Sequence, residues 1–415
     1  MRGGGPRCRA CGAALRITLC DLGATPLANA LLEPTPEATA AERAHPLKVM
    51  VCSACHLAQT EQSPPPEAIF HGGYAYFSSY SQGWVAHARA YAEAMRARFG
   101  LGPQSRVVEA ASNDGYLLQH FVAAGVPALG VEPAANTAAA ARQRGVETRV
   151  AFFGAETARA LVAEGWAADL TAANNVLAHV PDIDDFVAGF AALLKPEGVS
   201  TFEFPHLLEL IEQGQFDTIY HEHYSYLSLL AVEGVFARHG LRAFDVERLS
   251  THGGSLRVFA CRAGASHAET PALGAIRAAE AAAGLDRAEG YAGFQARCDA
   301  MRAGFLDYLA AARAEGRRIA AYGAAAKGAT FLNFCGVGAD EIAFVTDRNP
   351  EKQGKLMPGS HIPIRPPQAL ADERPDDVLI LPWNLAAEIT AQHAYVRDWG
   401  GRFLVAAPEM RELRP

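Results

Sequence analysis

The sequence predicts an α/β protein in which a Rossmann-like domain with a parallel sheet lies between a small metal-binding domain and a second Rossmann-like α/β domain. Three observations predict this architecture. Two Cys-x-x-Cys pairs lie near the start of the chain, β-rich segments alternate with helical ones over residues 105–200, and a second alternation begins near residue 318. We expect domains over residues 1–68, 69–205 and 206–415.

Size and charge exclude several classes of protein. The 415 residues, 50% hydrophobic and 20% charged, suit two or three packed domains rather than a disordered or fibrous chain. A net charge of −8 provides no positive field for nucleic acid or anionic lipid. No apolar run approaches the roughly 18–20 residues that span a bilayer, and no hydrophobic signal core opens the sequence. We expect a cytoplasmic protein without nucleic-acid or membrane partners.

The N-terminal cysteines predict a structural zinc site. Cys8 and Cys11 form one pair, Cys52 and Cys55 form another, and four thiolates suit tetrahedral zinc. The 40 residues between the pairs must fold back to close the site. A redox-active pair and unpaired core cysteines are the alternatives, and Cys20 is expected in the core. Because a closed four-sulfur site leaves no position for substrate, we expect zinc to act as a scaffold.

The first alternation predicts a cofactor site at the carboxyl ends of its strands. A strand over 106–109 runs into the small-residue turn 110–115 and then a helix. A second strand, 128–131, is followed by Glu132, which is placed to accept hydrogen bonds from a ribose diol. A third segment, 168–176, turns from hydrophobic to polar. The expected cofactor-binding residues are Glu109, Ser112, Asn113, Asp114, Gly115, Glu132, Asn174 and Asn175.

The composition of this turn favours S-adenosylmethionine over a nicotinamide cofactor. Dinucleotide sites need G-x-G-x-x-G for close approach to a pyrophosphate, and here only Gly115 is present. The carboxylates of Glu109 and Asp114 would repel a pyrophosphate but suit the cationic methyl donor. A nicotinamide cofactor, and a Rossmann-like layer without any cofactor, remain the alternatives.

With these residues the chain resembles, nearly end to end, the sugar C-methyltransferases of deoxysugar biosynthesis, such as the enzyme that methylates C-3 of the dTDP-linked sugar that becomes tetronitrose. Beyond the cysteine pairs, the motifs are LGATPLAN at 22–29, YAYFSSYS at 74–81, EAASNDG at 109–115, VEPA at 131–134, NNVLAHV at 174–180, FDTIYHEHYSY at 216–226 and THGGSLR at 251–257. Ala111 departs from the glycine that class I methyltransferases generally carry.

The resemblance implies a class I S-adenosylmethionine-dependent methyltransferase domain, an N-terminal zinc-binding domain and a C-terminal domain that contributes to the sugar-nucleotide cleft. The implied substrate is an NDP-4-keto-deoxysugar. A dTDP sugar is favoured with GDP as an alternative, and C-3 is favoured over C-5 as the methyl acceptor.

The Tyr-His-Glu-His segment at 220–223 is the expected chemical centre. Methylation of a carbon beside a ketone requires a base to take a proton from that carbon and donors to stabilise the enolate oxygen. Histidine has a pKa suited to the first task. A metal site and a surface polar loop are the alternatives for these residues. By resemblance, the active-site positions are Tyr74, His179, Tyr220, Glu222 and His223.

We expect His223 to be the base, with Tyr220 as its main rival. Glu222 would orient or tune the base, while Tyr74 and His179 would bind the sugar or donate to the enolate oxygen.

Residues 287–318 are alanine-rich and periodic, which predicts a long helix packed on the core. The apolar face of this helix comprises Phe294, Met301, Phe305, Tyr308 and Leu309.

The second alternation predicts an anion site in the C-terminal half. A strand over 318–322 is followed by a loop with Gly323, Lys327 and Gly328, and a strand over 342–346 is followed by Asp347. A helix N-terminus and a lysine suit a diphosphate, whereas Asp347 would suit a nicotinamide ribose. A nicotinamide-dependent sugar-nucleotide oxidoreductase is therefore the alternative function, and a non-catalytic zinc-containing binding protein is the third. The expected substrate-binding residues are Tyr76, Ser79, His221, Lys327 and Asn384.

Overall fold

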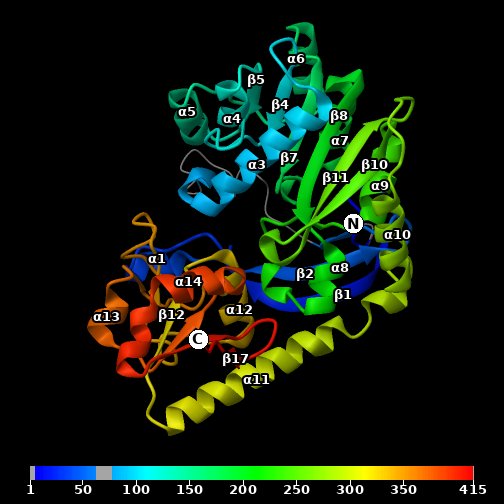
Figure 1. Ribbon diagram of the computed structural model, residues 1–415. Coiled ribbons are helices and arrows are strands. Elements are labelled where there is room, and N and C mark those ends of the chain that lie inside the picture. Colours follow the sequence, from blue (N-terminus) through cyan, green and yellow to red (C-terminus); the bar gives the residue numbers. More distant parts are fainter. Residues whose placement is uncertain (1–4, 62–76, 415) are drawn as a thin grey trace.

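The computed structural model describes residues 5–61 and 77–414, so Tyr74 and Tyr76 lie outside the described residues. Three sheets organise the chain, with strand orders β1-β2-β3-β9, β10-β11-β8-β7-β4-β5-β6 and β14-β13-β12-β15-β16-β17. In Figure 1 the sheet of the middle domain occupies the top, the C-terminal domain lies at the lower left, and β1 and β2 run below the middle domain. The predicted α/β architecture is confirmed.

The N-terminal sheet is antiparallel and folds the two cysteine pairs together. The long hairpin of its first two strands spans the 40-residue interval that separates the pairs. Its fourth strand comes from a segment that lies far away in the sequence. The elements are β1 (Leu15–Thr25), α1 (Pro36–Ala41), β2 (His45–Cys52), β3 (Ala58–Thr60) and β9 (Ser225–Tyr226).

The middle domain has five parallel strands, β8-β7-β4-β5-β6, extended by the hairpin of β10 and β11. Every residue of β4 and β5 is buried, as expected for parallel strands that are covered on both faces. The strands are β4 (Val107–Ala110), β5 (Ala128–Val131), β6 (Glu147–Arg149), β7 (Ala168–Asn174), β8 (Leu194–Pro205), β10 (Leu241–Leu249) and β11 (Ser255–Arg262).

The helices of this region follow the alternation predicted from the sequence up to β8. They are α3 (Gln82–Phe99), α4 (Leu118–Ala123), α5 (Ala135–Gln143), α6 (Ala155–Ala163), α7 (Ile183–Leu193), α8 (Leu207–Gln213), α9 (Leu229–Arg238) and α10 (Pro271–Ala282). Because β11 pairs with β8, residues 241–262 belong to the sheet of the middle domain. This sheet therefore extends past residue 205, where we expected the domain to end.

The C-terminal domain is a second parallel sheet with an antiparallel edge strand. Its strands are β12 (Ile319–Tyr322), β13 (Val345–Thr346), β14 (Ile364–Arg365), β15 (Asp377–Ile380), β16 (Arg402–Val405) and β17 (Arg411–Glu412). Its helices are α12 (Ala326–Cys335), α13 (Ala369–Glu373) and α14 (Ala386–Gln392), and the long helix α11 (Phe294–Ala314) leads into it.

Short 3-10 turns connect these elements, and several of them carry site residues. They are η1 (Ser78–Tyr80), η2 (Leu177–His179), η3 (Phe216–Thr218), η4 (Thr251–Gly253), η5 (Ala288–Tyr291), η6 (Trp383–Leu385) and η7 (Ala394–Trp399).

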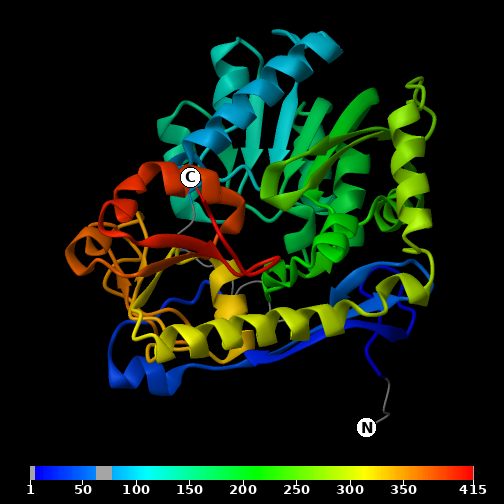
Figure 2. The ribbon, with the colours of Figure 1, turned by 60° about the horizontal axis from the view of Figure 1, so that its bottom comes forward.

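The N-terminal sheet and the C-terminal domain share one hydrophobic core. Leu19 and Leu47 from the N-terminal hairpin belong to the same buried cluster as Phe305 of α11 and Leu332 of α12. Figure 2 shows α11 running along the underside of the molecule beside β1. Among the described residues, no helix combines the length and the apolar character needed to cross a bilayer.

Candidate active site and metal centre

The loop after β4 carries an unusual backbone. Ala111, Asn113 and Gly115 have φ angles of +54°, +49° and +78°. This left-handed region is uncommon for residues other than glycine, and least unusual for asparagine. A Cβ atom on Gly115 would lie 3.2 Å from the Cβ atom of Ala141, so the loop packs closely on α5. The predicted small-residue turn therefore exists, and Ala111 adopts the conformation that glycine favours.

Glu132 holds this loop in place from the end of β5. Its two carboxylate oxygens accept hydrogen bonds from the amide of Asn113 and the amide of Ala134, each at 2.9 Å. Burial raises the pKa of Glu132, and the two amide bonds act in the opposite direction. Each oxygen keeps a second lone pair, so a ribose diol could still donate to this carboxylate.

Several buried polar atoms around the loop lack hydrogen-bond partners among the described residues. They are Ser112 Oγ, Asp114 Oδ1, Asn174 Oδ1, and both amide atoms of Asn175. Buried polar groups are normally paired, so this concentration at the carboxyl ends of β4 and β7 fits a polar ligand. The residues thus fit the aminoacyl and ribosyl groups of S-adenosylmethionine.

One glycine and one carboxyl group, Gly130 and Glu109, also belong to this region. Gly130 leaves room for Ser112, because a Cβ atom there would lie 2.2 Å from the serine hydroxyl oxygen. Glu109 is buried, and this burial raises its pKa well above the usual range, while a hydrogen bond to Tyr116 opposes the shift.

Ser79, which we expected to bind substrate, contacts the loop that follows β4, residues 111–115, which we call the donor-site loop. Its amide donates to Asp114 Oδ2 at 3.3 Å, and its hydroxyl accepts from Arg144 at 2.7 Å. Arg144 also pairs with Asp114 at 3.0 Å. These contacts attach η1, the turn that precedes α3, to the loop that follows β4.

Two imidazoles and a phenol form a compact cluster at the predicted chemical centre. The ring centroid of His223 lies 4.0 Å from that of Tyr220 and 4.6 Å from that of His179. His179 belongs to η2, which follows β7 directly, so the cluster lies next to the carboxyl end of that strand. Three of the five expected active-site residues are therefore brought together.

The hydrogen bonds of the two histidines define their tautomers. Nδ1 of His223 lies 2.9 Å from the carbonyl oxygen of Thr218, and Nδ1 of His179 lies 2.8 Å from the carbonyl oxygen of Glu222. A carbonyl only accepts, so each Nδ1 carries the proton and each Nε2 carries the lone pair. Burial lowers the pKa of His179 to about 4. The pKa of His223 is lowered well below its usual range, mainly by burial and secondly by the charge that His179 would carry.

Glu222, which we expected to orient the base, and His221, which we expected to bind substrate, both make side-chain hydrogen bonds with the N-terminal domain. Glu222 Oε1 accepts from Asn29 Nδ2 at 3.1 Å, and burial raises the pKa of this carboxyl group. His221 Nε2 donates to the carbonyl oxygens of His45 and Pro46 at 3.1 and 3.2 Å. His221 is therefore buried against the N-terminal domain, and the backbone carbonyl of Thr218, rather than Glu222, orients His223.

Lys327 lies in a polar group at the edge of the C-terminal domain. Its Nζ atom donates to Asn384 Oδ1 at 3.0 Å and lies 4.4 Å from the ring centroid of Trp383. The indole N–H of Trp383 donates to Asp217 Oδ2 at 2.7 Å. Burial raises the pKa of Asp217 to about 6, although Lys327 opposes the shift. The structure thus brings the predicted residues Lys327 and Asn384 together. They lie beside η3, the turn that precedes the Tyr-His-Glu-His segment.

His252 is a site residue that the sequence analysis did not select. It has a φ angle of +56°, its ring meets Trp84 edge-on with the ring centroids 5.4 Å apart, and its buried Nδ1 atom has no hydrogen-bond partner among residues 5–61 and 77–414. A positive charge on His252 would lower the pKa of His223. A histidine followed by two glycines in the motif 251–257 was the available signal.

The four N-terminal cysteines converge as the sequence predicted. Their sulfur atoms all lie within 4.8 Å of one another, with Cys8 to Cys55 and Cys11 to Cys52 both at 3.5 Å. Contact with Cys55 lowers the pKa of Cys8 to about 4, which favours a thiolate. Four sulfur donors at these separations fit a tetrahedral zinc ion.

The C-terminal loop does not offer the space of a dinucleotide site. A Cβ atom on Gly323 would lie 2.5 Å from Pro382, so a proline occupies the approach that this glycine would give to a cofactor. Asp347 already accepts from the amides of Ala324 and Asn349 and pairs with Lys352 at 3.5 Å. The proline beside Gly323 and the ion pair of Asp347 with Lys352 argue against the nicotinamide alternative.

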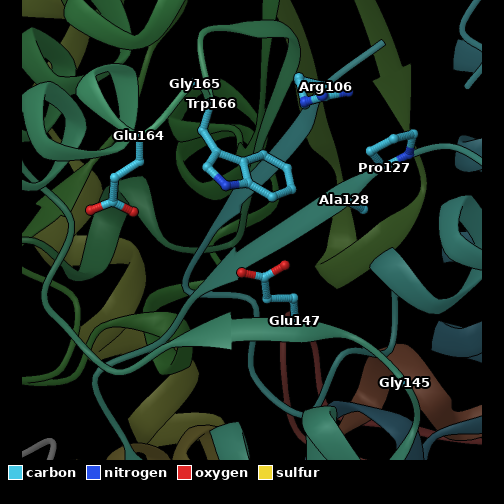
Figure 3. A pocket seen from close by; sticks show the side chains of 8 residues that line it. All are labelled: Arg106, Pro127, Ala128, Gly145, Glu147, Glu164, Gly165 and Trp166. Atoms are coloured by element: carbon cyan, nitrogen blue, oxygen red, sulfur yellow. The ribbon is translucent and has the colours of Figure 1, made fainter. Parts of the chain in front are cut away.

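A surface hollow of about 490 Å³ lies away from all predicted site residues (Figure 3). Its lining residues precede or begin the strands of the middle sheet, at the edge opposite the donor-site loop. Ligands of parallel sheets bind at the carboxyl ends of the strands, so this hollow is not assigned to the active site.

Comparisons with known proteins cover nearly the whole chain. Three family models match in succession: "Putative zinc binding domain" over residues 8–70, "Methyltransferase domain" over 84–246 and "C-methyltransferase C-terminal domain" over 250–408. The C-methyltransferase NovU of Streptomyces niveus is 39% identical over 406 residues, which are 98% of this chain and 96% of NovU.

Two further matches are partial. A ubiquinone biosynthesis O-methyltransferase of Chelativorans sp. (strain BNC1) is 31% identical over 111 residues, which cover 25% of this chain and 44% of that protein. The crystal structure of magnesium protoporphyrin IX methyltransferase (ChlM) from Synechocystis PCC 6803 with bound SAM matches with a TM-score of 0.34 and 16% identity, over 47% of this chain and 88% of that chain.

Proposed function

Since this chain belongs to the C-methyltransferase family, and is an S-adenosylmethionine-dependent C-methyltransferase, we propose that its substrate is an NDP-4-keto-deoxysugar methylated at C-3. The observation that carries the proposal is the pair of neutral imidazoles next to the carboxyl end of β7. Such a pair suits proton removal from a carbon that a neighbouring ketone has acidified.

His223 is the proposed base because its free lone pair is on Nε2. The bond from Nδ1 to Thr218 fixes the ring, and burial keeps it neutral at physiological pH. Nε2 takes the proton from the substrate carbon, and the electron pair of that C–H bond moves into the enolate. S-adenosylmethionine, when bound, supplies the electrophilic methyl group.

The remaining residues position substrate and stabilise charge. Tyr220 flanks the base and is proposed to donate to the enolate oxygen, a role we also assign to Tyr74. The only proton of His179 is used by the Glu222 carbonyl, so His179 is proposed to bind the sugar rather than to donate to the enolate. Lys327, with Trp383 beneath its ammonium group, is proposed to face the diphosphate of the sugar nucleotide. We favour a dTDP sugar over a GDP sugar.

The test separates proton removal from methyl transfer. His223→Asn should keep the hydrogen bond to Thr218 through its amide NH₂ group, and should bind S-adenosylmethionine as the parent protein does in calorimetry. It should lose on the order of 10²–10⁴-fold in kcat and should also lose solvent deuterium exchange at the substrate carbon.

Tyr220→Phe serves as the matched comparison. If His223→Asn retains the exchange and Tyr220→Phe abolishes it, Tyr220 is the base. If neither variant affects exchange or turnover of a dTDP-4-keto-deoxysugar, the proposed chemistry is wrong.

A further inference from the structure

The segment that carries the proposed base is continuous with the metal-binding domain. Directly after His223 and Tyr224, β9 becomes the fourth strand of the N-terminal sheet, where Tyr226 pairs with Ala58 and Ser225 pairs with Gln59. The Tyr-His-Glu-His segment at 220–223 therefore leads into a sheet whose other strands belong to the zinc-binding region. A displacement of that sheet would move the base.

Arg9, which lies between Cys8 and Cys11, connects the metal-binding region to the segment that carries His223. Its guanidinium Nη2 donates to the carbonyl oxygen of Thr60 at 2.8 Å and lies 3.3 Å from the Thr60 hydroxyl oxygen. The guanidinium carbon also lies 5.3 Å from the ring centroid of Tyr224, which is within the range of a cation–π contact. One side chain therefore touches both β3 and the residue after His223.

Thr60 and Tyr224 continue the connection to both imidazoles. The amide of Thr60 donates to the carbonyl oxygen of Tyr224 at 3.1 Å, and the amide of Tyr224 donates to the carbonyl oxygen of Ala178 at 2.8 Å. His223 immediately precedes Tyr224, and His179 immediately follows Ala178. A single row of hydrogen bonds therefore runs from Arg9 to the backbone of the two histidines.

Gln59 attaches the same row to a metal-ligating sulfur atom. This residue is 1% exposed, and its Nε2 donates to Cys8 Sγ at 3.2 Å while its Oε1 accepts from the amide of Arg9 at 2.9 Å. Such contacts orient metal ligands and connect them to the surrounding structure. The backbone of Arg9 is held between Cys8 and Cys11 and again by Gln59.

We propose that Arg9 is a positioning residue for the methyl transfer, which transmits the geometry of the zinc site to His223 through Thr60 and Tyr224. This inference rests on the proposed role of His223. Arginine is suited to the task because its planar group can hydrogen bond to Thr60 and stack on Tyr224 at once, whereas lysine offers a point charge on a flexible stem.

The first test is Arg9→Ala, with Arg16→Ala as a charge-matched control because the side chain of Arg16 is exposed. Arg9→Ala should keep its zinc by metal analysis and keep its affinity for S-adenosylmethionine. Its kcat should fall about 10- to 100-fold, since a misplacement near 1 Å can cost that much, while KM changes less than threefold. Arg9→Lys should recover only part of the loss.

A second readout does not depend on activity. Hydrogen exchange in the peptide over 218–228 should become faster in Arg9→Ala than in Arg16→Ala, because Tyr224 loses its neighbour. If exchange and kcat both match those of the control while zinc is retained, the inference is wrong.

A double-mutant cycle distinguishes failure of this inference from failure of the proposed function. If Arg9 acts through His223, then Arg9→Ala should lower kcat by less than twofold in the His223→Asn background. Full additivity would overturn the positioning role. Normal turnover of His223→Asn by itself would overturn the proposed function instead.

Tyr224→Leu covers the case in which Arg9→Ala loses zinc. Leucine removes the aromatic ring that Arg9 contacts and leaves the cysteines and Gln59 unchanged. Kinetics and exchange in the peptide 218–228 equal to those of the parent protein in Tyr224→Leu, together with zinc loss in Arg9→Ala, would reduce Arg9 to a structural residue of the metal site and refute the inference.

Discussion

At the scale of single residues, His252 combines a strained backbone with a polar atom that finds no hydrogen-bond partner in the described part of the chain. Its φ angle of +56° places it in a region that few residues with a side chain adopt. The turn is held around it, because Thr251 donates to Glu203 at 3.2 Å and Gln215 donates to the carbonyl oxygen of Gly253 at 2.7 Å. Burial lowers the pKa of His252 to about 4.

This pKa predicts a specific loss of stability in acid. In the unfolded chain this histidine has a pKa of about 6.5. Between pH 6.5 and about 4, the unfolded chain therefore binds more protons than the folded chain. The contribution of His252 is therefore complete above pH 6.5 and is lost as the pH falls toward 4. His252→Asn tolerates the left-handed backbone and cannot titrate. Its melting temperature should decrease less between pH 7 and pH 5 than that of the parent protein, and equal decreases would contradict this expectation.

At the scale of elements, a buried carboxylate from α10 caps the start of α9. Glu280 is 2% exposed, and its two oxygens accept from the amides of Leu229 and Leu230 at 2.6 and 2.8 Å. One of them also lies 2.7 Å from His206 Nε2 at the end of β8. Acidic groups stabilise helix N-termini, so this side chain joins two helices and the central sheet.

Glu280→Ala should lower the free energy of unfolding by about 3–5 kcal/mol, because a buried imidazole and two amides lose their partner. Urea denaturation measures this effect. Glu233→Ala is the matched control: it removes a surface pair with Arg277 that also joins α9 to α10, and it should cost about 0–1 kcal/mol. Equal costs for the two variants would show that the capping contact contributes little.

At the scale of the whole molecule, the N-terminal sheet packs against the rest of the protein. Its residues share a core with α11 and α12, and its fourth strand, β9, closely follows the Tyr-His-Glu-His segment. Its α1 region also reaches the C-terminal domain, where Glu42 lies 2.9 Å from His361 Nε2. The N-terminal sheet and α1 therefore contact both the C-terminal domain and the segment that leads from the chemical centre.

Leu47→Ala tests this shared core. Leu47 is 0% exposed in β2, and its truncation should cost about 2–5 kcal/mol. Hydrogen exchange should become faster in α11 and α12 as well as in the N-terminal hairpin. Leu385→Ala, at a residue that is 44% exposed, should leave all of these rates unchanged. Faster exchange that stays within β1 and β2 would indicate two independent cores.

Most of the architecture could be predicted because its signals are local. The two cysteine pairs indicate the metal centre, and the alternating segments of 105–200 and beyond 318 match β4 to β8 and β12 to β16. The residues of the donor-site loop lie within a few positions of their strand ends, so the topology of a parallel sheet brings them together. The sequence also contained the motifs by which the family was identified.

The sequence by itself therefore determined the class of fold, the four metal-ligating cysteines and the methyl-donor domain, since short spacings encode them. Only the tertiary structure decided that Thr218 rather than Glu222 orients His223, that Glu222 meets Asn29 and that β9 joins the metal-binding sheet. The Asn29 contact and the pairing of β9 join residues more than 150 positions apart, and Thr218 reaches His223 through a turn of the backbone. Because such contacts depend on how whole elements pack, no local sequence pattern predicts them.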